Sequence, residues 1–171
     1  TPPVASRIFN RNNSEKVTQE LRLSSPAGQR FAWQVAGFYT HESADIDQRL
    51  FGQNFTSGEI ISLPTLGNTD SKQNYEEFAV YANTTYKFND SFDLSAGIRY
   101  SHSKQDGVSI TNGVLLGGLK TNPSKSSENL VTYMVSPTFH FAKDTMAYFR
   151  VASGYRPGGA NLFVPGTPES Y

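Results

Sequence analysis

Three arginines are the residues of this chain best suited to bind an anion. Arg99 and Arg150 each lie inside an extended run of alternating residue types, and Arg156 lies in the glycine-rich stretch 154–159. A guanidinium group presents several donors in one plane, which suits carboxylate and phosphate oxygens. These three arginines are therefore the candidates for contact with an anionic ligand. The alternative, favoured for Arg99 and Arg150, is a water-facing charge paired with a neighbouring carboxylate.

No other group of residues has the spacing that catalysis or metal binding requires. His41, His102 and His140 lack a second ligand at metal-site spacing, and a solvated histidine at a loop edge is the simpler interpretation of the first two. The stretch 154–159 lacks the phosphate-loop pattern GxxxxGK[ST]. Spacing suggests no carboxylate pair and no Ser/His/Asp triad. The sequence therefore predicts no enzyme and no cofactor.

Composition excludes further classes of function. The chain has no cysteine, which rules out disulfides, thiolate metal sites and a cysteine nucleophile. It carries 15 basic and 15 acidic residues, and this neutral balance argues against a nucleic-acid partner. The mean hydropathy of −0.47 suggests a soluble protein. That value does not exclude a membrane, because a barrel strand exposes only every second residue to lipid.

The elements that would position the arginines are β-strands. The clearest runs from Phe92 to Tyr100, where apolar residues at every second position share one face and Arg99 lies on the other. Period-2 alternation is typical of a strand with two different environments. Similar runs occupy residues 17–23, 31–40, 77–88, 131–141 and 147–151. Pro137 lacks an N–H for the ladder, so we expect a bulge or local fraying there.

The connections between these strands alternate in length. Short turns near Pro26, Asp90 and Lys143 close three hairpins, whereas polar stretches of residues 45–74 and 103–127 join one hairpin to the next. Long loops without structure are uncommon in compact soluble domains. Bacterial outer-membrane barrels have short periplasmic turns and long extracellular loops. The pattern therefore predicts six strands with the short turns on the periplasmic side.

Aromatic residues gather near the strand ends of the apolar faces, with small or aliphatic residues between them. Examples are Phe92 and Phe139 beside short turns, and Tyr39, Phe78 and Tyr100 toward the long stretches. Two aromatic bands around an aliphatic belt are typical of a transmembrane β-barrel. A soluble β-sandwich also alternates apolar and polar residues, and it remains the alternative.

Several segments, taken in order, resemble TonB-dependent outer-membrane receptors. They are residues 18–26 (TQELRLSSP), 31–39 (FAWQVAGFY), 77–81 (EFAVY), 94–100 (LSAGIRY), 135–137 (VSP) and 148–161 (YFRVASGYRPGGAN). The resemblance covers most of the chain outside the long polar stretches. It implies a fold that is all-β: an antiparallel transmembrane β-barrel, here an open curved sheet of about six strands with short periplasmic turns and long extracellular loops.

The resemblance also implies a function. It suggests part of a transporter in the outer membrane of a Gram-negative bacterium that imports a scarce nutrient, first of all a ferric siderophore. Its partners would be outer-membrane lipid, its own plug domain and the TonB energising complex, and the three arginines could then contact the plug. We expect residues 1–171 to be a partial barrel without plug, signal peptide or closing C-terminal strand. The alternatives are a passive porin-like or adhesin barrel and a soluble all-β binding module.

Overall fold

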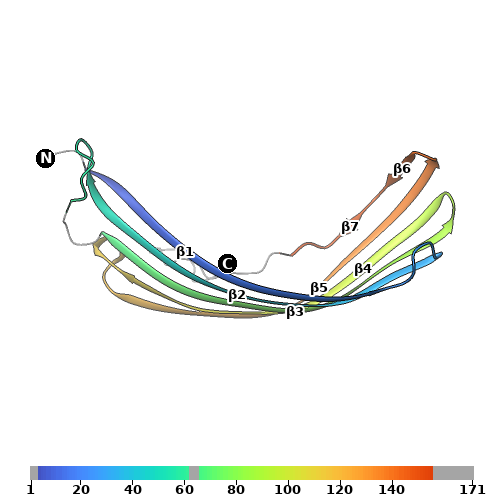
Figure 1. The fold of residues 1–171 in the computed structure, drawn as a ribbon, viewed down its shortest axis with the longest axis horizontal. Helices are drawn as coiled ribbons and strands as arrows, with labels where there is room; N and C mark the ends of the chain where they lie inside the picture. The colour runs from blue at the N-terminus through green and yellow to red at the C-terminus, as the bar shows by residue number, and fades with distance from the viewer. Residues whose placement is uncertain (1–3, 62–65, 156–171) are drawn as a thin grey trace.

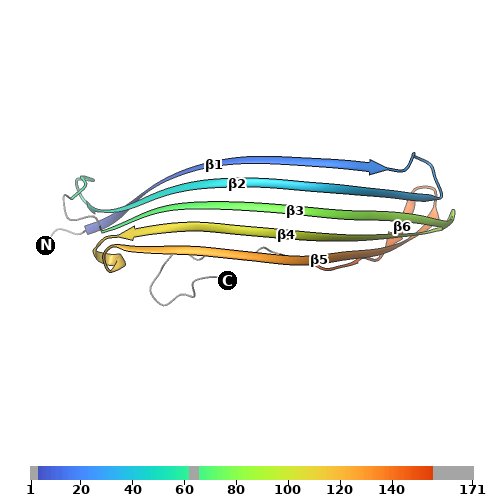
Figure 2. The ribbon, with the colours of Figure 1, turned by 90° about the horizontal axis from the view of Figure 1, so that it is seen from below.

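A computed structural model describes residues 4–61 and 66–155, and it shows one antiparallel sheet. The strands are β1 (Val4–Ser24), β2 (Phe31–Asn54), β3 (Gly67–Asn89), β4 (Phe92–Asn112), β5 (Lys120–Ala142), β6 (Thr145–Tyr148) and β7 (Val151–Ala152). A single 3₁₀ turn, η1 (Val114–Leu116), lies between β4 and β5. Strands β1 to β5 lie side by side in chain order, and β6 and β7 both pair with β5 (Figure 2). The all-β prediction is confirmed.

Short turns close the three predicted hairpins. Only Asp90 and Ser91 separate β3 from β4, and only Lys143 and Asp144 separate β5 from β6. The side chain of Asn89 accepts a hydrogen bond from the backbone N–H of Ser91 at 2.9 Å, which stabilises the first of these turns. Gly28, in the β1–β2 turn, has a φ of +83°, a conformation that side chains disfavour.

The long polar stretches predicted between the hairpins are mostly strand. β2 continues to Asn54 and β3 begins at Gly67, while β4 continues to Asn112 and β5 begins at Lys120. The predicted loops of residues 45–74 and 103–127 were therefore wrong in extent. The physical reason is that hydrogen bonds of the backbone hold the ladder whatever the side chains are. In these segments polar side chains lie on both faces of the strands, so the alternation of apolar and polar residues that indicates a strand is absent.

Pro137 interrupts a neighbouring strand rather than its own. β5 passes Pro137 in register with Leu94 of β4, so the bulge expected there is absent. On the other side, β6 ends at Tyr148 and β7 begins at Val151. The N–H of Phe149 donates to the carbonyl of Pro137 at 3.1 Å, but proline has no N–H to return the bond. The break between β6 and β7 follows from this missing donor.

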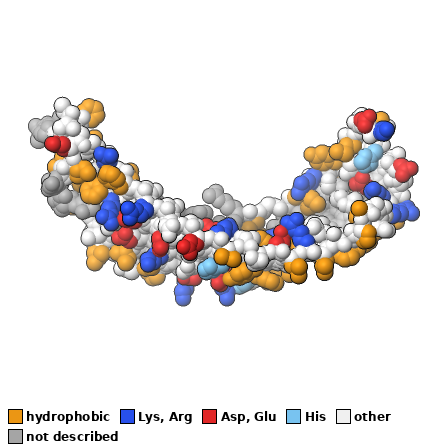
Figure 3. Space-filling view, viewed as in Figure 1, with side chains coloured by type: hydrophobic (Ala, Val, Ile, Leu, Met, Phe, Trp, Pro, Cys, Tyr) orange, Lys and Arg blue, Asp and Glu red, His pale blue; other side chains and the backbone are white. Residues whose placement is uncertain are grey.

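The sheet is bowed and has one convex and one concave face (Figure 1). Among the described residues no second layer covers either face: Ile98 is 56% exposed, and the buried apolar residues are Ala36 and Ala79. Apolar side chains line the convex edge toward the short turns and give way to charged ones further along (Figure 3). None of the helical segments described here is long and apolar enough to cross a membrane.

Candidate functional site

The convex face carries an apolar belt, which we define by the outward residues from Phe31 to Tyr39 on β2 and from Phe92 to Tyr100 on β4, with their partners on β1, β3 and β5. Each run matches the about 9–11 residues that a tilted strand needs to cross hydrocarbon. Its large side chains are exposed, with Leu21, Leu23, Val80 and Tyr133 each at 44% or more. The belt therefore presents to its surroundings the surface that lipid favours.

Aromatic rings border this belt at both ends. Beside the short turns, five rings form a continuous row across four strands, with neighbouring ring centroids 4.7–6.5 Å apart: Phe31, Tyr86, Phe88, Phe92 and Phe139. At the other end Tyr39 pairs with Phe78, and Tyr100 lies opposite Val80. Aromatic rings at two levels are the expected anchors at the two membrane–water interfaces.

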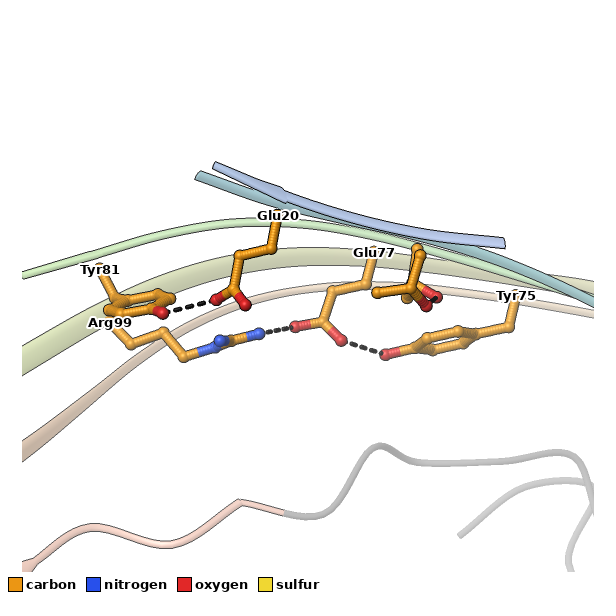
Figure 4. A network of polar contacts seen from close by, with 7 residues as sticks. Glu20, Tyr75, Glu77, Tyr81 and Arg99 are labelled. Atoms are coloured by element: carbon orange, nitrogen blue, oxygen red, sulfur yellow. Dashed lines mark hydrogen bonds and ion pairs between the residues drawn. The ribbon is translucent and has the colours of Figure 1, made fainter. Parts of the chain in front are cut away.

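The concave face behind the belt carries a network of charged and phenolic side chains (Figure 4). Glu20 on β1 is its first centre. One carboxylate oxygen accepts from the Arg22 guanidinium at 2.5 Å, and the other accepts from the Tyr81 hydroxyl of β3 at 2.5 Å. Both oxygens of this carboxylate therefore have donors within the wall, and the contact with Tyr81 joins strands that are not neighbours in the sheet.

Glu77 on β3 is the second centre of the network. Its oxygens accept from the Arg99 guanidinium at 2.6 Å and from the Tyr75 hydroxyl at 3.0 Å. The Arg99 guanidinium also lies over the rings of Phe38 and Tyr81, with centroid distances of 5.2 and 5.9 Å. Burial, and then the bond to Glu77, raise the pKa of the Tyr75 hydroxyl, which lies beyond the belt. These contacts fix Arg99 in one orientation.

Small residues make room for these long side chains. Ala36 of β2 lies opposite Arg22 and Tyr81, and Ala79 of β3 lies opposite Phe38. Ala36 is 8% exposed and Ala79 is fully covered. The alanines form a floor over which the charged and aromatic side chains of the neighbouring strands extend, so the network depends on the strand register as much as on the charged residues.

Of the three predicted site arginines, two line one hollow on the concave face. Arg99 and Arg150 border a space of about 330 Å³ together with Tyr81, Asn83 and Thr132. Arg99 is paired with Glu77, as the alternative interpretation proposed. Arg150 is exposed, and no carboxylate pairs with it within the described residues. Arg156 lies outside the described residues.

Each histidine contacts a polar neighbour on the adjacent strand. His41 lies 3.3 Å from Glu76, His102 lies 2.8 Å from Asn129, and His140 lies 2.8 Å from Asp93. In residues 4–61 and 66–155 no group of three or more His, Cys, Asp or Glu residues is placed to hold a metal ion.

The polar contacts of Glu20 and of Tyr155 were not predicted from the sequence. Glu20 and Arg22 share a face two residues apart, which alone signals a possible pair on a strand. The Tyr81 hydroxyl donates to Glu20, and the Tyr155 hydroxyl donates to Glu128. Both hydrogen bonds join residues that are distant in the sequence. They could be found only after the pairing of the strands was known.

Beyond the belt the same strands continue as a second region, which we call the extension: residues 4–17, 41–54, 67–76, 102–112 and 120–129. Its convex face carries charges, including Asp45, Lys72 and Asp106, while Ile46 and Leu50 share the concave face with amide and hydroxyl side chains. Arg49 on the convex face binds Asp47 at 3.0 Å, and this bond raises the pKa of the guanidinium. Beyond the outer aromatic residues the convex surface is thus mostly charged and polar, although Phe9, Phe51 and Ile110 also lie on it.

A sheet that is apolar outside over one membrane thickness and holds paired charges inside is the wall of a transmembrane β-barrel. The particular family follows from sequence. The family description "TonB dependent receptor-like, beta-barrel" matches residues 4–170, and the chain belongs to this family. TonB-dependent receptors are transporters of the Gram-negative outer membrane and not a class of enzymes.

Individual relatives agree with this assignment. The chain is 28% identical over 144 residues to the pesticin receptor of Yersinia pestis and 27% identical to that of Yersinia enterocolitica. These alignments cover 84% of the chain, which spans 20% of each relative's length. The crystal structure of the ferric yersiniabactin uptake receptor FyuA from Yersinia pestis matches 98% of the chain with a TM-score of 0.78 at 20% identity, over 25% of its own length. That similarity supports the fold.

Proposed function

We propose that this chain forms part of the wall of a receptor that captures a scarce nutrient at the cell surface and imports it through the outer membrane of a Gram-negative bacterium. The observation that carries the proposal is the division of the sheet between an apolar belt outside and the Glu20 and Glu77 networks inside. Outer-membrane lipid would contact the belt. The side with the short turns would face the periplasm, and the extension would rise above the outer surface.

The proposed nutrient is a ferric siderophore. Support comes from a structural relative described as a ferric yersiniabactin uptake receptor, together with curated relatives named as receptors for pesticin. No residue of this chain is itself diagnostic of iron. Cobalamin and carbohydrate are therefore the substrates against which the proposal has to be tested.

The proposed partners of the concave face are a plug domain and, through it, the TonB complex. The network of Glu20, Glu77 and Arg99 stands on this face at the depth of the belt, where a plug inside the barrel would meet the wall. Arg150 has an exposed guanidinium for a carboxylate of the plug or an anionic ligand, and Arg156 remains a proposed contact of the same kind. The proposal requires a plug domain outside residues 1–171, and neither a cofactor nor a nucleic acid takes part.

Uptake by cells tests this function. A strain that lacks the receptor is supplied with the wild-type gene, and accumulation of ⁵⁵Fe is measured with a panel of ferric siderophores, with labelled cobalamin as the comparison. We expect one siderophore complex to enter only when the receptor and TonB are both present. If cobalamin entered and no ferric siderophore did, the proposed nutrient would be cobalamin in place of a siderophore. Uptake that persists without TonB would contradict the receptor mechanism and indicate a passive pore.

A further inference from the structure

Charge separates the two faces of the extension. On the convex face charged side chains occur on every strand from β1 to β5, and examples are Arg11, Lys72 and Lys125. On the concave face of these described strands the charged residues are two lysines and two glutamates: Lys16, Glu42, Lys120 and Glu128. Their formal charges cancel, although both faces belong to the same strands in the same register.

The few charged groups of the concave face are engaged with polar neighbours. Lys16 binds Glu42 at 2.9 Å, so each of these charges is balanced by the other. The carboxylate of Glu128 accepts a hydrogen bond from the Tyr155 hydroxyl. Lys120 lies at the outer end of β5, next to the turn that precedes this strand. The concave face of the extension therefore offers a ligand no excess of either sign of charge.

Hydroxyl and amide side chains make up most of the same face. Ser109 and Asn122 are partners in the register, and Thr111 follows Ser109 on the same face of β4. The hydroxyls of Ser109 and Thr111 and the amide nitrogen of Asn122 are buried without a hydrogen-bond partner within the described residues. Because a buried polar group without a partner costs free energy, these groups favour a ligand that forms hydrogen bonds. Ile8 and Leu50, also partners, add a small apolar patch.

Under the proposed function this concave face would line the outer mouth of the barrel, which a nutrient meets before it reaches the belt. A mouth with an excess of cations attracts an anionic ligand and raises its association rate by about 10–10³-fold. The chain contains the arginines and lysines for such a mouth, but in the extension it places most of them on the convex face. The arrangement therefore does not favour an anionic ligand.

We propose that the concave face of the extension binds a ferric complex without net charge, of the class in which three singly charged hydroxamate groups neutralise Fe³⁺. The proposal rests on the proposed function and deepens it, because it names the chemical class of the siderophore. Hydroxamate oxygens accept hydrogen bonds from hydroxyl and amide donors such as Ser109 and Asn122. Three doubly charged catecholate groups would leave the ferric complex strongly anionic. Arg150 lies beside Thr132 at the depth of the belt, below this mouth.

Ligand binding to the whole receptor that carries this chain tests the proposal. The purified receptor in bilayer nanodiscs is titrated with a ferric trihydroxamate and with a ferric tris-catecholate. The dissociation constants are measured by quenching of protein fluorescence at low and at high salt. The wild type should bind the neutral complex at least about tenfold more tightly than the anionic complex. High salt should change the dissociation constant of the neutral complex by less than about twofold.

Ser126 and Ser127 provide a matched pair of variants, because they are adjacent residues of the same type on opposite faces of β5. Ser126→Lys adds a cation to the concave face. It should tighten binding of the anionic complex by about 3–10-fold at low salt, and high salt should remove this gain. Ser127→Lys adds the same charge to the convex face and should leave both dissociation constants unchanged. Gln105→Lys, opposite Ser126 in the register, is a second concave variant if Ser126→Lys does not fold.

Two results would overturn the neutral ligand and leave the proposed receptor function intact. The first is wild-type binding of the anionic complex that equals or exceeds binding of the neutral one. The second is a gain from the concave lysine variants that is no larger than the gain from Ser127→Lys, because the concave face would then not meet the ligand. A receptor that neither binds nor imports a ferric complex of either class would reject the proposed function itself.

Discussion

The belt and the extension are built from the same strands in one continuous register, yet their convex faces differ: this face is apolar over the belt, whereas over the extension it is mostly charged and polar and includes a few apolar residues such as Phe9 and Ile110. In the belt, Ile98 points outward and Arg99 inward, whereas in the extension Lys72 points outward and Ile46 inward. The backbone ladder is the same in both regions, so the difference lies in the solvent. The proposed function accounts for this difference: the convex side would meet hydrocarbon over the belt and water over the extension, with the change near Tyr39, Phe78 and Tyr100.

Arginine substitutions on one face of β4 should separate the two regions most strongly. Ile98→Arg in the belt should lower the free energy of unfolding by about 2–4 kcal/mol, the cost of an arginine near the bilayer midplane. Ile110→Arg, from the same residue type on the same convex face of the extension, should change it by less than about 0.5 kcal/mol. Urea titration of the receptor in phospholipid vesicles measures both. Equal losses of unfolding free energy in the two variants would mean that no boundary between membrane and water lies between Ile98 and Ile110.

Glycines on the concave face of β4 test whether the extension is a packed ladder. A Cβ at Gly107 would lie 2.7 Å from the backbone oxygen of Lys72, whereas at Gly97 the nearest atom, at 2.4 Å, is the side-chain oxygen of Asn83. Backbone yields less readily than a side chain, so Gly107→Ala should cost about 1–3 kcal/mol and Gly97→Ala less than about 1. Thermal unfolding of the two variants measures this, and a smaller cost at Gly107 would indicate a loose extension.

Ion pairs of the concave face should also differ between the regions. Glu77→Ala leaves Arg99 and Tyr75 without their acceptor, and Glu77 is only 18% exposed, so the loss should be about 1–3 kcal/mol. Glu42→Ala breaks the pair with Lys16 in the extension, where the glutamate is 37% exposed, and should cost about 0–1 kcal/mol. Chemical unfolding at low and at high salt distinguishes the pairs, because only the second should weaken clearly with salt.

The smallest effect concerns Tyr75, at the boundary of the two regions. Its pKa is raised in the folded protein, so the folded state keeps the proton after the unfolded chain has lost it. Stability should therefore fall as the pH rises above about 10, the ordinary pKa of tyrosine. Tyr75→Phe should reduce this fall, as measured by unfolding at pH 8 to about 11 against the wild type. An unchanged pH profile would show that the pKa of the Tyr75 hydroxyl is not raised in the folded protein.

The belt could be predicted from the sequence better than the extension. In the belt, alternation located the strands and the face of Ile98 and Arg99, although the run predicted at residues 147–151 is divided between β6 and β7. In the extension, water lies outside and polar side chains lie inside, so residues 45–54 and 103–112 carry no such signal. The pairing of Arg99 with a carboxylate was foreseen as an alternative, but its partner Glu77 and the contact between Tyr81 and Glu20 depend on the register of four strands.

Because the extension is continuous sheet, the part of the molecule proposed to stand outside the cell offers little to a protease. Cleavage requires a segment that can leave its hydrogen bonds and enter an enzyme cleft, and such segments concentrate at loop tips. Within the described residues above the belt, the tips are Phe55–Ile61 and Gly113–Leu119. Protease treatment of intact bacteria should therefore release few peptides from the described residues, and antibodies that recognise the living cell would find the accessible loop epitopes of this part at the same two places.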